Sequence, residues 1–385
     1  MLGDIELVRA LGAAGISSAV AAGPHDPIRF SRHVVATLEP DRGSRLDALL
    51  EFGSREAPPP VLYFDSDESL MFVSRNRDRL AAGYRFVLPP AERVDELVDK
   101  ARFQALAERL DLPVPRGRLV RPSDSGPEEL GLGFPLVVKA VPYRDDRWRG
   151  VGFEAKVARV NTLAEARSLW PRLAAQDLQV LAQETIAGGE IRVVSYHAYV
   201  DADGKVAGEF TGRKLRTWPQ EYGMSSALVT TDDPGVASLG RELLERLEYR
   251  GVAKLDFKRA SDGRLYLLEV NPRFTLWVEP GARAGVNLPA LVYADLTGSP
   301  RPATPPARAG VRWISPRLDA AAARADGVPL LRWLAFAVAC ETNAVFAWDD
   351  TGPLVRGRLG PALVGAVRGL GGSLGDGGTR SPGAA

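Results

Sequence analysis

Short apolar runs alternate with amphipathic stretches along the first 95 residues of the chain. Strands are predicted at residues 16–22, 34–37 and 61–64, and helices at 7–14, 45–51 and 68–80. Strands that alternate with helices favour a parallel sheet with a site at the carboxyl ends of its strands. We therefore expect residues 1–95 to form a Rossmann-like α/β domain, in which the apolar strand that should precede Gly3 is missing.

Polar residues mark where several of these helices begin. Asp65, Ser66 and Asp67 follow the third predicted strand, and we interpret them first as caps of the next helix. Asp99 and Thr162 stand at the same position before two later helices. Capping alone is enough to explain these side chains, although a position at a strand end also suits a ligand site.

The pattern changes at about residue 96, where longer helices and hairpins begin. Helices are predicted at 100–110, 162–175 and 233–248, and strands at 134–141, 180–186, 192–200, 205–215, 252–257 and 265–270. This α+β pattern predicts a second domain at 96–298. A Pro-rich break follows, and we expect a partly helical C-terminal extension at 299–370 and a disordered tail at 371–385, which is rich in Gly and lacks an apolar pattern.

The most informative stretch is a pair of apolar runs that flank Asp262 and Gly263. An Asp-Gly pair between two strands is a strong signal for a two-residue hairpin turn. With that turn, Asp256 lies directly opposite Glu269, and side chains alternate between the two faces of the hairpin. We expect a core face of Ala253, Leu255, Phe257, Tyr266, Leu268 and Val270, and an acidic face of Lys254, Asp256, Lys258, Glu269 and Asn271, with Leu265 and Leu267 nearer the turn.

The acidic face predicts a metal site. Two carboxylates directly opposed on a sheet repel each other, but a divalent cation between Asp256 and Glu269 would turn the repulsion into ligation. Asn271 adds a carbonyl oxygen on the same face, and oxygen ligands that leave room for water and phosphate suit Mg²⁺ or Mn²⁺. Arg273 follows two positions later, where it can meet a phosphate. The alternative is a solvated face whose lysines offset the two acids.

Composition and charge limit the kinds of partner that the protein is expected to bind. The 385 residues carry 49 basic and 48 acidic side chains, a net charge of +1, which gives no electrostatic reason to expect nucleic acid or a membrane surface. The longest apolar run, at 328–340, is too short to span a bilayer and ends at the single cysteine, Cys340, which we expect to be packed. One cysteine and no secretory pattern favour the cytoplasm. His25, His33 and His197 match no zinc motif, and a homodimer is compatible with the sequence.

Asp256 followed by Glu269-Val270-Asn271-Pro272-Arg273 resembles the metal-binding element of the ATP-grasp superfamily. The likeness is greatest to its carboxylate–amine ligase branch, which includes proteins like D-aspartate ligase and carbamoyl-phosphate synthase. It runs from about residue 5 to about residue 350. It implies an ATP-grasp fold: an N-terminal pre-ATP-grasp domain, then two α+β lobes at about 96–183 and 187–298 that clasp ATP between them.

The resemblance assigns phosphate-binding roles to three lysines. Lys139 stands alone in an apolar strand and matches the lysine that reaches the ATP phosphates; a side chain that snorkels from the strand end is the alternative. Lys100 matches the lysine that opens the ATP-binding unit, and Lys214 matches a second phosphate-contacting base. Ordinary surface positions are the alternative for both of these.

The resemblance also assigns the adenine and ribose contacts. Glu184 and Ile186 match the hinge between the lobes, where backbone groups contact adenine and an apolar side chain packs on its ring. Glu190 matches the acid that binds the ribose hydroxyls, and a surface loop acid is its alternative. The stretch 143–156 departs from the family, because it holds only two glycines where a glycine-rich loop is expected over the phosphates.

These matches imply an ADP-forming ligase with Arg273 and Lys139 as catalytic residues and small-molecule carboxylate and amine substrates. The carboxylate attacks the γ-phosphate of ATP, and an amine, or less often a thiol, displaces phosphate from the acyl-phosphate. Arg273 and the loop 222–226 are the expected substrate contacts. Two other functions remain open: a regulatory ATP-binding protein without turnover, and an enzyme that makes carboxyphosphate or carbamate from bicarbonate. A dinucleotide oxidoreductase is disfavoured, because no G-x-G-x-x-G occurs near the N-terminus.

Overall fold

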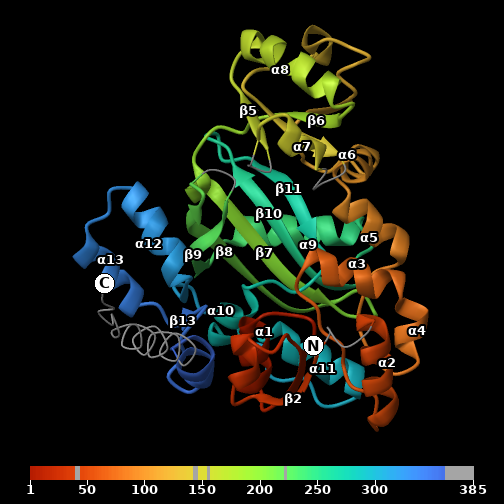
Figure 1. Ribbon diagram of the computed structural model, residues 1–385, viewed down its shortest axis with the longest axis vertical. Coiled ribbons are helices and arrows are strands. Elements are labelled where there is room, and N and C mark those ends of the chain that lie inside the picture. Colours follow the sequence, from red (N-terminus) through yellow and green to blue (C-terminus); the bar gives the residue numbers. More distant parts are fainter. Residues whose placement is uncertain (40–43, 142–145, 154–156, 221–222, 360–385) are drawn as a thin grey trace, which may run out of the picture.

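The computed structural model describes residues 1–39, 44–141, 146–153, 157–220 and 223–359. The described residues form a two-stranded, a four-stranded and a seven-stranded sheet. Figure 1 shows the four-stranded sheet and helix α8 (Leu163–Ala175) as a separate lobe above a larger body, which the other two sheets and their helices form. The expected fold class, an α/β unit followed by α+β lobes, is confirmed.

The N-terminal unit is a small parallel sheet with helices around it. Strands β1 (Ser18–Ala21) and β2 (Val34–Leu38) pair in parallel. The helices are α1 (Ile5–Ala13), α2 (Arg45–Arg55), α3 (Asp67–Arg75), α4 (Arg77–Ala81) and α5 (Ala91–Val98). Before α1, the Met1 amino group donates to the Ala19 carbonyl in β1 at 2.7 Å, and Leu2 forms a parallel bridge with Phe64. Two residues are too few to give a strand pattern in the sequence.

The first lobe is a four-stranded antiparallel sheet in the order β3-β6-β4-β5. The strands are β3 (Gly117–Val120), β4 (Leu136–Val141), β5 (Ala158–Val160) and β6 (Gln179–Glu184). Helix α8 covers one face with Leu169 and Leu173, and Thr162 caps it, as predicted, by accepting the Glu165 N–H. Because side chains alternate along a strand, the other face of β4 and β6 is left to line a cleft.

The second lobe is a seven-stranded sheet in the order β11-β10-β7-β8-β9-β12-β13. Its strands are β7 (Val193–Val200), β8 (Val206–Trp218), β9 (Met224–Thr231), β10 (Gly251–Arg259), β11 (Leu265–Asn271), β12 (Arg312–Ile314) and β13 (Thr342–Asn343). Helices α6 (Lys100–Arg109) and α9 (Pro234–Arg246) share one apolar cluster with the sheet, and α1, α10 (Val278–Arg283) and α11 (Leu288–Thr297) share another. Strands β12 and β13 continue this sheet, so these two segments of the expected C-terminal extension are built onto the second lobe.

The β10–β11 hairpin has the predicted pairing at its acidic end and a different one near its turn. Asp256 pairs with Glu269, as the sequence indicated. The turn, however, is a three-residue loop at 261–263, in which Gly263 adopts a φ of 88°. Leu268 then forms a bulge, and this extra residue restores the predicted pairing beyond it.

The bulge changes the face on which three residues lie. Leu268 was expected in the core but lines the cleft, and Tyr266 pairs with Lys258 on the cleft side. Leu267 was expected on the acidic face but is fully buried against Phe257. Because the residues at 265–268 are all apolar or aromatic, hydrophobic alternation could not distinguish the two arrangements.

Candidate active site

A cleft of about 350 Å³ lies between the two lobes, and the first turn of α3 closes one end of it. Nine of the ten site residues that the sequence predicted line this cleft: Lys100, Lys139, Glu184, Ile186, Lys214, Asp256, Glu269, Asn271 and Arg273. The side chain of the tenth, Glu190, lies outside the described residues. The structure therefore brings together side chains that are up to 173 positions apart in the sequence, and their individual roles remain predictions.

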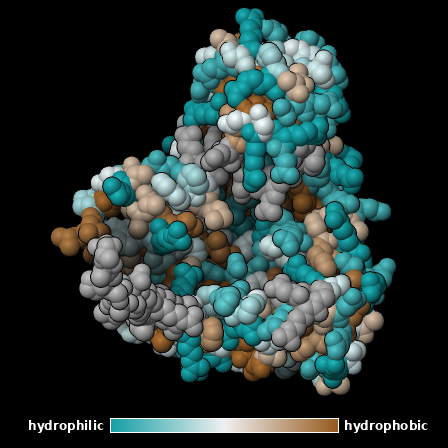
Figure 2. All heavy atoms as spheres, viewed as in Figure 1, coloured by the Kyte–Doolittle hydropathy of each residue, from teal (hydrophilic) through white to brown (hydrophobic). Residues whose placement is uncertain are grey.

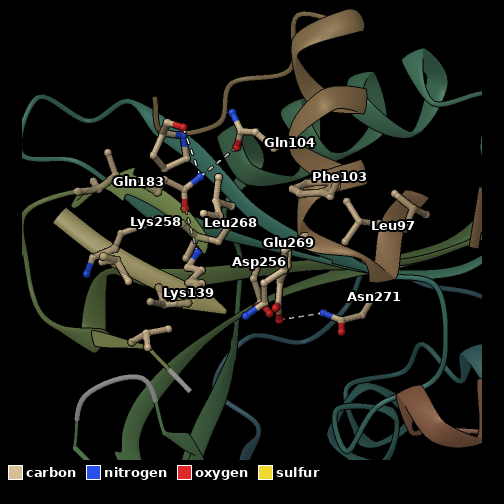
Figure 3. Close-up of a pocket in the computed structure, with 18 of the residues that line it drawn as sticks. Leu97, Phe103, Gln104, Lys139, Gln183, Asp256, Lys258, Leu268, Glu269 and Asn271 are labelled. Atoms are coloured by element: carbon tan, nitrogen blue, oxygen red, sulfur yellow. Dashed lines mark hydrogen bonds between the residues drawn. The ribbon is translucent and has the colours of Figure 1, made fainter. Parts of the chain in front are cut away.

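The floor of the cleft holds the opposed acids of β10 and β11. Asp256 is 3% exposed; its Oδ2 accepts a hydrogen bond from Lys254 Nζ, and its Oδ1 has no hydrogen-bond partner. Glu269 is open to the cleft, and its Oε1 accepts a hydrogen bond from Asn271 Nδ2 at 3.0 Å. Figure 3 shows the Asp256 and Glu269 carboxyl groups side by side, as their pairing requires.

Burial and neighbouring charges shift the pKa values of Asp256 and Glu269 in opposite directions. The pKa of Asp256 is raised, first because burial disfavours its charged form and also because Glu269 lies beside it; Lys254 opposes this shift. Burial also acts on Glu269, but the charges of Lys254 and Lys214 and the hydrogen bond from Asn271 outweigh it. They hold the pKa of Glu269 well below its usual range. A proton or a cation is therefore needed to keep both carboxyl groups this close.

The donor atoms at this position fit Mg²⁺. A buried carboxylate oxygen without a partner, such as Asp256 Oδ1, is costly, and a bound cation would remove that cost. Asn271 Oδ1 accepts from Arg273 Nη2 at 3.2 Å, and its second lone pair remains for a metal. No cluster of three or more His, Cys, Asp or Glu side chains suited to a metal occurs in the described part of the chain. A metal here would therefore need water or phosphate oxygens as further ligands.

A buried amide holds Lys139 in the opposite wall of the cleft. Lys139 Nζ donates to Gln183 Oε1 at 2.9 Å, and Gln183 Nε2 donates to Pro115 O at 3.3 Å and to Gln104 Oε1 at 3.4 Å. Figure 3 shows this chain of hydrogen bonds ending at the ammonium group. Burial lowers the pKa of Lys139, while the charge of Glu269 opposes the shift. From the sequence, Gln183 was placed only in the hinge and Gln104 had no role, so the contact of this pair with Lys139 was not predicted.

The other two predicted lysines reach the cleft from different elements. Lys100 is the first residue of α6, and Asp99 caps that helix, as predicted, by accepting the N–H groups of Ala101 and Arg102. Lys214 extends from β8, and its charge also helps to lower the pKa of Glu269. With Lys139 and Lys258, four lysines of the described chain thus line one cleft whose floor carries two acids, an arrangement suited to a polyphosphate with a divalent cation.

Arg273 connects the β10–β11 hairpin to the N-terminal unit. Its Nε donates to Asp67 Oδ1 at 2.7 Å, and its Nη1 donates to Asp65 O at 2.8 Å. The capping interpretation applies to Ser66 alone, which accepts the Ser69 N–H. Asp67 is therefore available for the cleft, a role that depends on a contact across 206 sequence positions.

The hinge differs in detail from what the sequence suggested. The Glu184 N–H donates to Arg116 O, and its carboxylate accepts from Gly133 N at 2.8 Å, so both groups are engaged within the first lobe. Ile186 lines the cleft as expected, and Thr185 Oγ1 is buried there without a hydrogen-bond partner. The hinge thus presents an apolar side chain and an unsatisfied hydroxyl, which suit a flat, polar-edged ring.

Some predicted features lie away from the cleft. His197 is buried beneath the sheet, with its Nε2 at 2.9 Å from Ser195 Oγ and its ring stacked on Phe210. Of the loop 222–226 that was expected to contact substrate, Gly223 lines the cleft, whereas Ser226 donates to the buried Asp319. Tyr222 and much of the stretch at 142–156 lie outside the described residues.

Two lobes that close on a cleft lined by lysines and an opposed acid pair define a nucleotide-clasping protein of the ATP-grasp class. Residues 208–315 match the family described as "ATP-grasp in the biosynthetic pathway with Ter operon". The chain is therefore similar to ATP-grasp proteins in sequence over these residues, and in fold over most of its length.

Similar curated proteins are amino-acid ligases. A D-alanine--D-alanine ligase of Stutzerimonas stutzeri is 28% identical over 221 residues, which cover 52% of this chain and 65% of the relative. A D-aspartate ligase of Enterococcus faecium is 27% identical over 190 residues, which cover 46% of this chain and 45% of the relative. The chain therefore spans less than two thirds of the length of these relatives.

Solved structures share the fold at low identity. A biotin carboxylase from Campylobacter jejuni in complex with an ATP analogue has a TM-score of 0.60 at 13% identity, over 80% of this chain and 71% of that one. An L-amino acid ligase from Bacillus licheniformis has a TM-score of 0.52 at 15% identity, over 72% and 73% of the two chains. These similarities confirm the fold and leave the reaction to be argued from the site.

Proposed function

We propose that the protein is an ADP-forming ligase that uses ATP and Mg²⁺ to join a small-molecule carboxylate to an amine through an acyl-phosphate. The main support is the opposed acid pair with its unpartnered buried oxygen, which faces Lys139 across a cleft between two lobes. The named relatives D-alanine--D-alanine ligase and D-aspartate ligase favour an amino acid among the substrates. Displacement by a thiol is the less favoured form of the same chemistry.

The cleft residues would act mainly by position and charge. Lys139, Lys100 and Lys214 would neutralise the phosphates of ATP and place the γ-phosphorus for attack by the carboxylate. Arg273 would stabilise the transferred phosphoryl group, and its bonds to Asp67 and Asp65 would fix the guanidinium in place. The amine then attacks the acyl carbon, phosphate leaves, and the proton of the amine passes to solvent or to phosphate.

The metal would be held by Asp256, Glu269 and Asn271 at the cleft floor. Mg²⁺, or Mn²⁺, supplies charge neutralisation to the β- and γ-phosphate oxygens when it is bound. Lys254 would favour the ionised form of both acids, and it would oppose the effect of burial that raises the pKa of Asp256. The sequence reasoning named Lys254 only as a neighbour that offsets the acids.

The adenine and ribose contacts complete the proposal. Ile186 would pack on the adenine ring, the hinge at 184–186 would contact the polar edge of the ring, and Glu190 would bind the ribose hydroxyls. No helix in the described residues is long and apolar enough to cross a membrane. Together with the single cysteine, this supports a cytoplasmic enzyme whose partners are small molecules.

The test is ADP release with Mg-ATP and pools of carboxylates and amines. We expect release to require both pools and to fall by at least ~100-fold in Asp256→Asn and Glu269→Gln, because even the outer partners of metal ligands typically contribute 10–100-fold. Asp262→Asn is the matched control: it makes the same change in the same hairpin, at an exposed turn where Asp262 bonds only to Arg264. Equal ADP release by all four proteins would contradict the site assignment.

The outcome also separates the alternative functions. ATP binding without ADP release under any substrate pool would identify a nucleotide-binding protein without turnover. ADP release stimulated by bicarbonate alone would indicate carboxyphosphate chemistry. Either result would leave the fold intact and overturn the proposed ligase.

A further inference from the structure

Asp67 is the first residue of α3, and its side chain lines the end of the cleft beside Arg273. Its Oδ1 accepts the hydrogen bond from Arg273 Nε at 2.7 Å, whereas its Oδ2 has no hydrogen-bond partner among the described residues. The side chain is 42% exposed. Figure 2 shows the surface hollowed between the upper lobe and the larger body, with hydrophilic atoms around the hollow. One carboxylate oxygen of Asp67 is therefore open to a ligand in the cleft.

The other carboxylates that line the cleft in the described part of the chain have partners or expected roles. Asp256 and Glu269 form the opposed pair that is expected to hold the metal. The Glu184 carboxylate accepts from Gly133 N at 2.8 Å, within the first lobe. No histidine of the described residues lines the cleft. Asp67 is thus the described acid that remains for a cationic group of a substrate.

The neighbouring acids do not share this position. Asp65 Oδ2 accepts the Asp4 N–H at 2.6 Å, and neither of these two residues lines the cleft. The Glu68 side chain is 76% exposed outside the cleft, where it pairs with Arg45 at 3.1 Å. Asp67 is therefore the member of this acidic segment that faces the cleft.

We propose that Asp67 Oδ2 binds the amine substrate in its ammonium form and accepts its proton, which makes Asp67 a catalytic residue. The inference rests on the proposed function, because Arg273 is expected to hold the acyl-phosphate beside this carboxylate. The nitrogen forms a bond to the acyl carbon, and the bond from that carbon to the phosphate oxygen breaks. One proton of the ammonium passes to Oδ2 and then to solvent, and a second passes to the departing phosphate.

A carboxylate at this point meets two needs of the amine. Alkylamines are protonated near neutral pH, as the pKa of lysine shows, and a nitrogen that keeps its extra proton has no lone pair for attack. Asp67 supplies a charge that attracts the ammonium and an acceptor for the proton. The same carboxylate lies against the guanidinium of Arg273, so it offsets the repulsion between the two cations. The structure therefore favours an alkylamine or amino group over an uncharged nucleophile.

The test compares two small acceptors, hydroxylamine and methylamine, with Mg-ATP and the pool of carboxylates. They are similar in size, but near neutral pH hydroxylamine is largely uncharged and methylamine is an ammonium ion. In Asp67→Asn, the ratio of N-methylamide to hydroxamate should fall by at least ~100-fold, the lower end of what a positioned general base contributes. Hydroxamate formation should fall far less, because Asn keeps an oxygen for Arg273 Nε. Glu68→Gln, the same change at the next residue, is the matched control and should leave the ratio unchanged.

The outcomes separate this inference from the proposed function. An unchanged ratio in Asp67→Asn would overturn the inference, even if both products fell together, because Asp67 would then act only by holding Arg273. A wild type that forms hydroxamate but no N-methylamide would also overturn it. In all of these cases hydroxamate formation by the wild type would still support the acyl-phosphate. A wild type that forms neither product and releases no ADP would contradict the proposed function, and this inference with it.

Discussion

Replacing Gln183 by Leu should weaken ATP binding, although Gln183 is not expected to touch the nucleotide reaction centre. The Gln183 side chain accepts the hydrogen bond from Lys139 Nζ and is itself held by Pro115 and Gln104. Leu has a similar volume but no acceptor, so the substitution removes the bond that positions the buried ammonium group. The fold should survive, because Gln183 is 7% exposed and a leucine is well suited to a buried position.

The expected loss of ATP affinity in Gln183→Leu follows from the conformational entropy of the Lys139 side chain. Without its acceptor, Lys139 has to be ordered by the phosphates themselves, which costs ~1.5–2 kcal/mol for a lysine. At 1.4 kcal/mol for each factor of ten, ATP binding should weaken by ~10–30-fold near pH 7. An effect much larger than this would mean that Gln183 contacts the nucleotide directly.

The pH dependence of ATP affinity is a second, independent test of the role of this hydrogen bond. Burial already lowers the pKa of Lys139, and the phosphates bind its protonated form, so ATP affinity should fall as the pH rises through that pKa. Loss of the Gln183 acceptor removes a bond that favours the ammonium form, so the fall should occur at lower pH in Gln183→Leu. In Gln183→Glu, a carboxylate beside the ammonium raises the pKa of Lys139, and the fall should occur at higher pH.

The assay is calorimetric titration with a non-hydrolysable Mg-ATP analogue between about pH 6.5 and about pH 9.5. Gln220→Leu is the matched control, because Gln220 makes an exposed side-chain hydrogen bond to Asp326 away from the cleft. The reasoning is refuted if Gln183→Leu, folded by circular dichroism, binds the analogue as tightly as the wild type with the same pH profile.

Two further predictions concern stability, measured by urea unfolding. Burial raises the pKa of Glu279 to about 8 and its Oε2 has no partner, so stability should fall as the pH rises from the ordinary value of 4.5 towards 8. Glu279→Gln should therefore be more stable than the wild type at about pH 9 but not at about pH 5; identical pH profiles would contradict this. Arg216 bonds both oxygens of the fully buried Asp319, at 2.7 and 2.6 Å. Arg216→Met should cost ~3–5 kcal/mol, whereas Arg308→Met, at an exposed ion pair, should cost ~0–1 kcal/mol; equal losses would refute this ranking.

Local signals in the sequence predicted much of the fold. Periodicity and caps located most helices and strands, and an Asp-Gly pair located the hairpin that carries the acids. The lone Lys139 in an apolar strand pointed to the cleft because burying an unpaired charge is costly. These inferences succeeded because each depends on neighbours within one element or one hairpin.

Contacts between distant segments could not be predicted in this way. Asp67 looked like one cap among three, because its partner Arg273 lies in another domain. Gln183 looked like part of a hinge, because the lysine that it holds belongs to another strand of the first lobe. The sequence also gave no sign that β12 and β13 extend the second lobe, since two short strands carry too little pattern.

The acid pair shows how a correct prediction can rest on incomplete reasoning. The three-residue turn shifts the pairing of the hairpin by one position near Gly263. If that shift continued, Glu269 would lie opposite Leu255 and would point towards the core, because a one-residue slip moves side chains to the other face. The bulge at Leu268 reverses the shift and places Glu269 opposite Asp256. Bulges are common beside active sites, where they redirect a side chain. We therefore infer that the bulge is part of the site, because the same residues paired without a bulge would place Leu268 opposite Asp256 and turn Glu269 towards the core.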